Sequence, residues 1–417
     1  MGDVTGINES SSMIMLTGVA RSGTTLLAEC LDHHPEIMCI SDAMNEFFKG
    51  FMRYAYRTVE NERKTTNYPI DHFFFSGSRR VSQFIDHTDL KHRIPDDLKE
   101  EILARIILRD GEYCPEIVES VRQCKAQSFD TLFIEMLGIL HDTYGKAGTV
   151  HFGTKAGWCE QLIRPLAKTF PNMVFINIIR DPRAIVASNY AFEKVTTARY
   201  PLPFHVRDWR KTVYYTWKFR QEDEALSSRV TSVKYEDLVE NPREILDGIA
   251  RFLSVRYDDA MLHRSFKKPN TSHKDTVDTR KISTQFTQKW KAILPESVVS
   301  QIEACCGREM GAVGYGRMHP EASTDADRLV SSEGIAYDSL SEWCKELVGS
   351  KAHYQTTWCP MNNLLEAARL TMLRGPKESM DSRLTAEFFY EDRYYQFLNS
   401  SQHLFARSPE AGRTVIG

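Results

Sequence analysis

No stretch of this 417-residue chain approaches the roughly 20 consecutive apolar residues of a membrane-spanning helix. The apolar run over residues 13–16 is also too short for the core of a signal peptide. The formal net charge is only -3, which gives no reason to expect nucleic acid or an anionic membrane as a partner. The sequence therefore predicts a cytoplasmic protein with no nucleic-acid or membrane partner, in which any anion site is local.

The nine cysteines form no C-x-x-C pair and show neither metal-ligand spacing nor the framework of a small disulfide-rich domain. We expect free thiols in a reducing compartment and no metal site. Repeats and low-complexity tracts are lacking as well. The composition, 42% hydrophobic and 26% charged, is that of a globular protein, and the length allows a large α/β domain plus a smaller addition.

Short apolar runs alternate with helical patterns along much of the chain. Residues 13–40 contain a strand, a glycine loop, a helix that stops before Pro35, and a second strand. This βαβ unit implies a parallel sheet with a right-handed crossover. The predicted fold class is therefore α/β, a P-loop-like parallel sheet flanked by helices. The five candidate strands cover residues 13–16, 37–40, 149–152, 173–179 and 229–235.

Two regions outside the sheet are helical in pattern. Residues 44–145 include the amphipathic segments 96–109 and 129–145, which predicts a helical cap inserted over the sheet. Residues 331–417 are polar with separate aromatic clusters, which predicts a C-terminal helical extension packed on a domain that covers residues 1–330. The pattern of the extension indicates no function.

The loop after the first strand reads GVARSGTT, residues 18–25, and has Thr24 where an ATP-binding P-loop has lysine. Parallel sheets bind ligands beyond the carboxyl ends of their strands, and a helix N-terminus there attracts anions. Gly23 lets the backbone approach closely, and Arg21 offers a planar cation suited to two oxygens. This pattern predicts an anion site, the alternative being a plain strand-to-helix turn.

A second candidate site follows the strand 173–179 and reads RDPRAIVAS. Pro182 suits the first helical turn and Asp181 its cap. Arg180 ends the strand, and Ser188 lies about two turns along the helix, so both contact one anion only if the ligand lies across the helix's flank. The alternative is an N-capped helix with surface charges.

The stretches GVARSGTTLL and IIRDPRAIVAS together resemble the paired signatures of sulfotransferases that use 3′-phosphoadenosine 5′-phosphosulfate (PAPS). The sequence is more similar to the Arg-type tyrosylprotein and carbohydrate branches than to the cytosolic branch, whose loop carries lysine. The resemblance continues through FGTKAGW and VKYEDLVENPREILDGIARFL and covers residues 13–316. It implies PAPS as co-substrate and adenosine 3′,5′-bisphosphate (PAP) as product, without metal.

The resemblance also implies a role for each matched residue. Arg21 would stabilise the charge on the bridging oxygen as it leaves, and Lys155 would assist the same leaving group unless it is a surface lysine. The implied ligands of the 5′-phosphosulfate are Arg21, Ser22, Gly23, Thr24 and Thr25, and those of the 3′-phosphate are Arg180 and Ser188.

Further cofactor contacts are implied toward the end of the resembling region. Tyr235 matches a position near the adenine, with a core aromatic at a strand end as the alternative. The glycine-rich clamp of cytosolic members is absent. Ser283, Lys289 and Lys291 are candidate substitutes for it, and an ordinary solvated charge cluster is the alternative.

The acceptor must lose a proton as the new bond forms, so a base has to lie within hydrogen-bond reach of it. Arg-type relatives use a glutamate just beyond the second strand, and Asp42 occupies that place here. Asp42 also suits the cap of the following helix, and Glu46 is the alternative base. Three histidines are further candidates, each with a structural interpretation as its alternative: His33, His34 and His141.

The resemblance implies metal-free, in-line sulfuryl transfer from PAPS to a hydroxyl, or an amine, of a small-molecule acceptor such as a natural product or a carbohydrate. A sulfuryl group carries less negative charge than a phosphoryl group, so Arg21 and the loop can suffice without the lysine and Mg²⁺ that kinases use. Two alternatives stay open, a P-loop nucleotide kinase and a non-catalytic sulfotransferase-like binding protein. A homodimer is an open alternative to a monomer.

Overall fold

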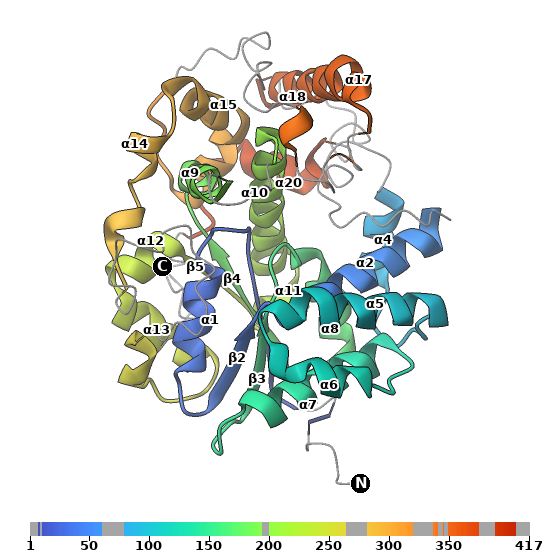
Figure 1. The fold of residues 1–417 in the computed structure, drawn as a ribbon. Coiled ribbons are helices and arrows are strands. Elements are labelled where there is room, and N and C mark those ends of the chain that lie inside the picture. The colour runs from blue at the N-terminus through green and yellow to red at the C-terminus, as the bar shows by residue number, and fades with distance from the viewer. Residues whose placement is uncertain are drawn as a thin grey trace.

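The computed structural model describes residues 7–8, 11–60, 79–193, 200–263, 282–319, 337–340, 345, 349–374 and 388–405. Five parallel strands form one sheet in the order β2-β3-β1-β4-β5, with helices on both faces (Figure 1). This confirms the predicted α/β class. The strands are β1 (Met13–Thr17), β2 (Ile37–Ser41), β3 (His151–Lys155), β4 (Met173–Ile179) and β5 (Val230–Lys234).

Four of the five strands differ from the predicted ranges by one to three residues at an end, and two of these differences bear on the site. The third strand begins at His151 and runs to Lys155, two residues later than expected at its start. Tyr235 begins the helix α12 (Tyr235–Glu240) instead of ending a strand. Where a strand ends depends on its hydrogen bonds to the neighbouring strands. The residues that flank these two strands gave no local signal for that position.

The alternation of side chains along the strands gives the sheet two buried faces. Ile14 and Leu16 of β1 pack in one core cluster, with apolar residues of α1 (Thr24–Asp32) and α13 (Pro242–Phe252). Met13 and Met15 pack on the opposite face in the main cluster. Strands buried on both faces read as mostly apolar runs, which is why β1 was visible in the sequence.

The region between β2 and β3 is helical over its described residues, as predicted for the cap. One predicted helix has the same bounds in the structure, and the other ends one residue earlier. Several phenylalanine rings pack edge to face where α2 meets α7, for example Phe51 against Phe129. The helices of this cap are α2 (Asn45–Glu60), α4 (Arg79–His87), α5 (Asp96–Arg109), α6 (Val118–Arg122) and α7 (Phe129–Tyr144).

The chain after β3 adds helices around the sheet and above its carboxyl edge. Those before residue 320 are α8 (Ile163–Thr169), α9 (Pro182–Glu193), α10 (Leu202–Trp217), α11 (Glu224–Ser227), α12, α13, α14 (Trp290–Ile293) and α15 (Glu296–Val313). The described helices of the C-terminal extension are α17 (Lys351–His353), α18 (Cys359–Arg374) and α20 (Asp392–Leu398). The boundary predicted near residue 330 falls outside the described residues and stays a prediction.

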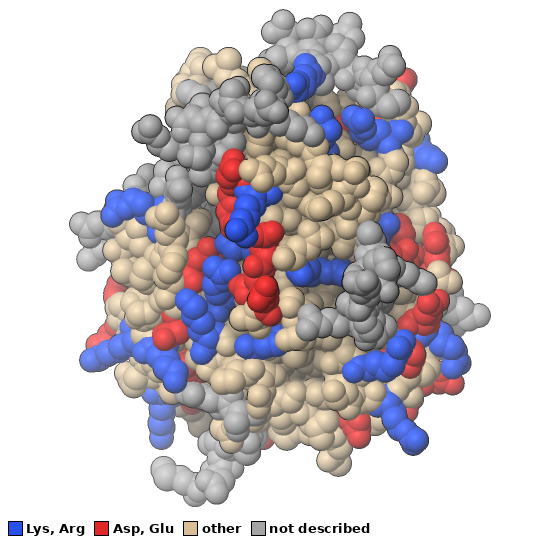
Figure 2. Space-filling view, turned by 180° about the vertical axis from the view of Figure 1, so that it is seen from behind, with Lys and Arg blue, Asp and Glu red and all other residues tan. Residues whose placement is uncertain are grey.

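The described surface carries charges of both signs. Figure 2 shows the face opposite to that of Figure 1, where basic and acidic side chains lie interspersed and a band of both crosses the middle. Among the described helices, none is long and apolar enough to cross a membrane.

Candidate active site

The carboxyl ends of β1 to β4 bring four loops to one edge of the sheet. Parallel pairing aligns Leu16 of β1 with Lys155 of β3, and Ser41 of β2 with the same Lys155. On the other side, Thr17 is aligned with Asn177 of β4. Each predicted site segment before residue 190 leaves the sheet at this edge, which is where ligands of open parallel sheets bind.

The loop after β1 requires its glycines. A Cβ on Gly18 would lie 2.5 Å from the carbonyl oxygen of Ile178, and one on Gly23 would lie 2.4 Å from the ring of Tyr235. Gly23 also has φ 101° and precedes α1, whose first backbone N–H groups have no partners within the helix. The side-chain oxygen of Ser22 is buried and has no hydrogen-bond partner among the described residues. Both features suit an anion at this helix N-terminus.

Arg180, directly after β4, is held by carbonyls and an aromatic ring. Its Nη1 donates to the carbonyl oxygen of Arg21 at 2.9 Å, and its Nη2 to that of Phe286 at 2.8 Å. The guanidinium lies 4.2 Å from the centre of the Tyr235 ring. Its Nε is buried without a hydrogen-bond partner, and the ion pairs between described residues include none to Arg180. Part of its hydrogen-bonding capacity is therefore available to a ligand.

The two predicted anion segments meet at Arg21. Its Nε donates to the Ser188 hydroxyl on α9 at 3.1 Å, across 167 residues of sequence. Burial, and then the charge of Arg180, lower the pKa of Arg21 to about 10. Two neighbouring cations in a desolvated position are stabilised by an anion, so this cluster has the charge that a phosphorylated nucleotide needs.

Asp42 and Lys155 form a buried ion pair beside this cluster. Lys155 Nζ lies 2.6 Å from Asp42 Oδ1, and the two side chains are 8% and 11% exposed. Asn45 Nδ2 donates to the same oxygen at 2.9 Å. Asp42 has φ 64°, a left-handed conformation that costs free energy in a non-glycine residue and is often found at functional sites. Asn45 was not predicted as a site residue, although its i+3 spacing from Asp42 was a signal for this contact.

The alternative bases have other partners. Glu46 accepts from Lys49 at 2.7 Å and lies 3.5 Å from Arg53. Burial acts to raise the pKa of Glu46, but these cations outweigh it and the pKa lies below the ordinary value. Asp110 Oδ2 accepts the Glu46 backbone N–H, and burial raises the pKa of Asp110 well above its usual range. Asp110 was not predicted, because no local pattern links it to Glu46.

The histidines lie toward the opposite edge of the sheet. His33 follows α1 and bonds the carbonyl oxygen of Glu29 at 2.7 Å, and His34 bonds that of Arg256 at 2.7 Å. His141 lies late in α7, with its ring against that of Phe152 near the start of β3. Among the described residues, no contact of these rings reaches the carboxyl edge.

The segment after residue 282 reaches the site through its backbone. Ser283 caps a short 3₁₀ turn by accepting from the Gln285 N–H, and Lys291 is exposed with its ammonium 5.6 Å from the ring of Trp290. Within the part of the chain that the structure describes, these contacts bring neither side chain to Arg180. The carbonyl of Phe286 does contact it, a backbone contact that side-chain patterns cannot reveal.

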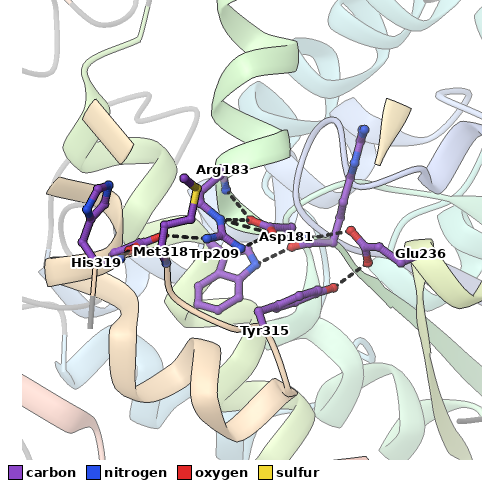
Figure 3. Close-up of polar contacts among 9 residues, drawn as sticks. Asp181, Arg183, Trp209, Glu236, Tyr315, Met318 and His319 are labelled. Atoms are coloured by element: carbon purple, nitrogen blue, oxygen red, sulfur yellow. Dashed lines mark hydrogen bonds and ion pairs between the residues drawn. The ribbon is translucent and has the colours of Figure 1, made fainter. Parts of the chain in front are cut away.

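A second polar cluster supports the strand end that carries Arg180 (Figure 3). The Asp181 carboxylate accepts from Arg183 Nη2 at 2.7 Å, and Arg183 Nη1 donates to Glu303 at 2.5 Å. The Asp181 backbone N–H donates to Glu236, which also accepts from the Tyr315 hydroxyl at 2.7 Å. This cluster fixes the backbone directly after Arg180.

The fold and this edge define a class of protein, and comparison with known families gives the same class. A model of the Sulfotransferase family matches residues 13–259, more than half of the chain. The chain therefore belongs to the sulfotransferase family, as the resemblance implied, and is a PAPS-dependent sulfotransferase.

Individual relatives are distant. Protein-tyrosine sulfotransferase 1 of Danio rerio is 24% identical over 348 residues, 78% of this chain and 81% of that protein. Carbohydrate sulfotransferase 3 of Tetronarce californica is 22% identical over 197 residues, 41% of this chain and 42% of that protein. Among solved structures, the sulfotransferase domain from the curacin biosynthetic pathway is similar with a TM-score of 0.41 and 14% identity, over 74% of this chain and 99% of that one.

Proposed function

We propose that this sulfotransferase moves a sulfuryl group from PAPS to a hydroxyl of a small-molecule acceptor, with Asp42 as general base. One observation carries the proposal: the Arg21, Arg180 and Ser188 contacts and the buried Asp42–Lys155 pair lie at the same edge of the sheet. The two arginines have the charge that binds the nucleotide. The ion pair supplies a base, Asp42, and a cation, Lys155, that can neutralise charge on the leaving group.

The cofactor would be held by residues whose polar atoms have spare capacity. Ser22 and the first amides of α1 would bind the 5′-phosphosulfate, and Arg180 with Ser188 would bind the 3′-phosphate. When bound, PAPS supplies the sulfuryl group and a phosphate leaving group. Arg21, between the two sites, would balance charge at both, which suits a nucleotide phosphorylated at its 3′ and 5′ positions better than ATP.

Proton transfer falls to Asp42, the carboxylate whose Oδ1 already lies against Lys155 and Asn45. Its second oxygen would accept the acceptor's proton as the O–S bond forms. Lys155 would turn from Asp42 toward the leaving oxygen and neutralise its developing charge. The exchange leaves Asp42 without its cation at the moment when a stronger base is needed.

Two classes of acceptor are candidates for this reaction. A natural product or a carbohydrate is our proposal for the acceptor, with an amine as a less common target than a hydroxyl. The phenol of a peptide tyrosine is the second candidate, because the tyrosine-sulfating relative aligns with 78% of this chain and the carbohydrate-sulfating one with 41%.

Isotope-labelled PAPS and a panel of sugars, alcohols, amines and tyrosine peptides would identify the acceptor. With that acceptor, we expect Asp42→Asn to lower kcat by about 10²- to 10⁴-fold, while calorimetry finds unchanged affinity for PAP. Glu46→Gln, a neighbouring buried carboxylate, is the matched control and should retain turnover. Full turnover by Asp42→Asn would move the base elsewhere, and Mg²⁺-dependent binding of ATP in preference to PAP would favour the kinase alternative.

A further inference from the structure

Helix α10, at the centre of Figure 1, is buried along almost its whole length, and its side chains contact both loops that carry the predicted site. Trp209 Nε1 donates to the carbonyl oxygen of Arg180 at 2.8 Å. Lys211 Nζ donates to the carbonyl oxygen of Trp158, three residues after Lys155, at 3.0 Å. Two side chains of one helical turn therefore hold the backbone beyond β4 and the backbone beyond β3.

Trp158 needs this support. It has φ 62°, a left-handed conformation that persists only where the surroundings impose it. Besides the contact from Lys211, its N–H donates to the carbonyl oxygen of Gly18 in the loop after β1 at 3.1 Å. Asp208 of α10 also accepts a side-chain hydrogen bond from Trp158. The position of α10 thus bears on the loop geometry around Lys155.

Between Trp209 and Lys211, Arg210 connects α10 to the C-terminal extension. Arg210 Nη2 and Nη1 donate to the two carboxylate oxygens of Glu366 on α18, at 2.6 and 2.8 Å. Arg210 and Arg369 of α18 both donate to the carbonyl oxygen of Cys305 in α15, and Arg369 also pairs with Glu309. All of these side chains are buried, so solvent screens their interactions little.

We infer that Glu366 is a positioning residue for the cofactor site: through Arg210 it fixes α10, and α10 fixes the carbonyls of Arg180 and Trp158. A two-point pair between planar groups restricts rotation and sliding of a helix, which a single contact does not. Glu366 lies outside the residues that match the family, so the extension completes the site from outside the shared domain. The inference rests on the proposed binding of PAP at Arg180.

The test is the preference for PAP over adenosine 5′-monophosphate, which lacks the 3′-phosphate that Arg180 would bind. For Glu366→Gln we expect this ratio of affinities, measured by calorimetry, to fall about 3- to 30-fold. A general loss of folded protein lowers both affinities together and leaves the ratio unchanged. A fall in the ratio therefore reports a displaced Arg180.

Glu391→Gln is the matched control. Glu391 also belongs to the extension and binds the far end of α10, accepting from the Tyr214 hydroxyl at 2.5 Å and pairing with Lys218 at 2.9 Å. Its contacts on α10 lie beyond the turn that contacts Arg180. We therefore expect Glu391→Gln to have the same ratio of affinities as the unmodified protein. Equal ratios for Glu366→Gln and Glu391→Gln would overturn the inference.

A second variant covers the case in which Glu366→Gln does not fold. Glu366→Asp keeps the charge but withdraws the carboxylate by one carbon, and the ratio should still fall; an unchanged ratio would overturn the inference. If the unmodified protein itself shows no preference for PAP, the proposed cofactor site fails first, so the two failures are distinguishable.

Discussion

Arg180 and Arg183 lie three residues apart at the same strand end, and the structure uses them differently. Arg183 binds the carboxylates of Asp181 and Glu303 and stacks 4.2 Å from the Trp290 ring. Arg180 contacts two carbonyl oxygens and the Tyr235 ring, and no ion pair to it occurs among the described residues. A buried cation with carboxylate partners holds the fold, whereas one with neutral partners retains charge for a ligand. Substitution of each should therefore damage a different property.

The largest effect is expected for Arg183→Met, on stability. Removing this cation leaves the carboxylates of Asp181 and Glu303, both buried, without their partner. Breaking one side of a buried pair costs about 3–5 kcal/mol. We expect a lower midpoint in guanidinium denaturation, with PAP affinity similar to that of the unmodified protein once the variant is folded at low temperature. A stable variant with lost PAP binding would reverse the roles assigned to the two arginines.

Arg180→Met should show the complementary behaviour. Hydrogen bonds to charged groups contribute about 1.5–3 kcal/mol, so PAP affinity should fall about 10- to 150-fold. Binding of adenosine 5′-monophosphate should change little, and Arg251→Met, an exposed arginine of α13, should leave both affinities unchanged. If calorimetry finds normal PAP affinity for Arg180→Met, the 3′-phosphate site lies elsewhere.

The same contrast explains which parts of the molecule were predictable. Arg180 was singled out because it ends a buried strand just before a helix, which is a local pattern, and the role of Ser188 on that helix was implied by the resemblance. The contact between Arg21 and Ser188 spans 167 residues, and that between Arg210 and Glu366 spans 156. Such contacts depend on how elements pack, and periodicity carries no information about them. The strands β1, β2 and β4 were visible because burial on both faces makes each of them mostly apolar, whereas β3 and β5 carry more polar residues.

The misses have the same physical origin. Helix α10 was not predicted, because its buried charged residues, among them Arg207 and Lys211, blur the apolar stripe of an ordinary packed helix. Asp42 was expected as the base, but its ion pair with Lys155 could not be foreseen. Asp42 follows β2 and Lys155 ends β3, and only the order of strands brings β2 and β3 side by side.

Asp208 on α10 is a buried carboxyl group, like those that pair with Arg183. Burial above all raises its pKa to about 7, with Lys211 acting in the opposite direction. Between the unfolded value near 4 and about 7, the folded protein binds a proton that the unfolded chain releases, so the free energy of unfolding falls as pH rises through this window. The slope from one such group is at most about 1.4 kcal/mol per pH unit.

Asp208→Asn should therefore flatten the pH dependence of unfolding between pH 4 and 7, as measured by denaturant midpoints at a series of pH values. Asp247→Asn is the matched control, since Asp247 is a 44% exposed carboxylate on α13. The same slope in Asp208→Asn and in the unmodified protein would mean that Asp208 is already ionised when folded and behaves like the paired carboxylates around Arg183.

The smallest effect is expected for Ser188→Ala. This variant tests whether Ser188 binds the ligand directly or acts by holding Arg21. The substitution removes one hydroxyl from Arg21 and from the proposed 3′-phosphate, and a single hydrogen bond contributes about 0.5–1.5 kcal/mol net. PAP affinity should fall about 3- to 10-fold, and Ser227→Ala, whose hydroxyl bonds only a local carbonyl, should leave it unchanged. If Ser188→Ala lowers the affinity for adenosine 5′-monophosphate by the same factor, Ser188 acts by holding Arg21 near the 5′-phosphate. A loss confined to PAP would instead join Ser188 to Arg180 as a ligand of the 3′-phosphate.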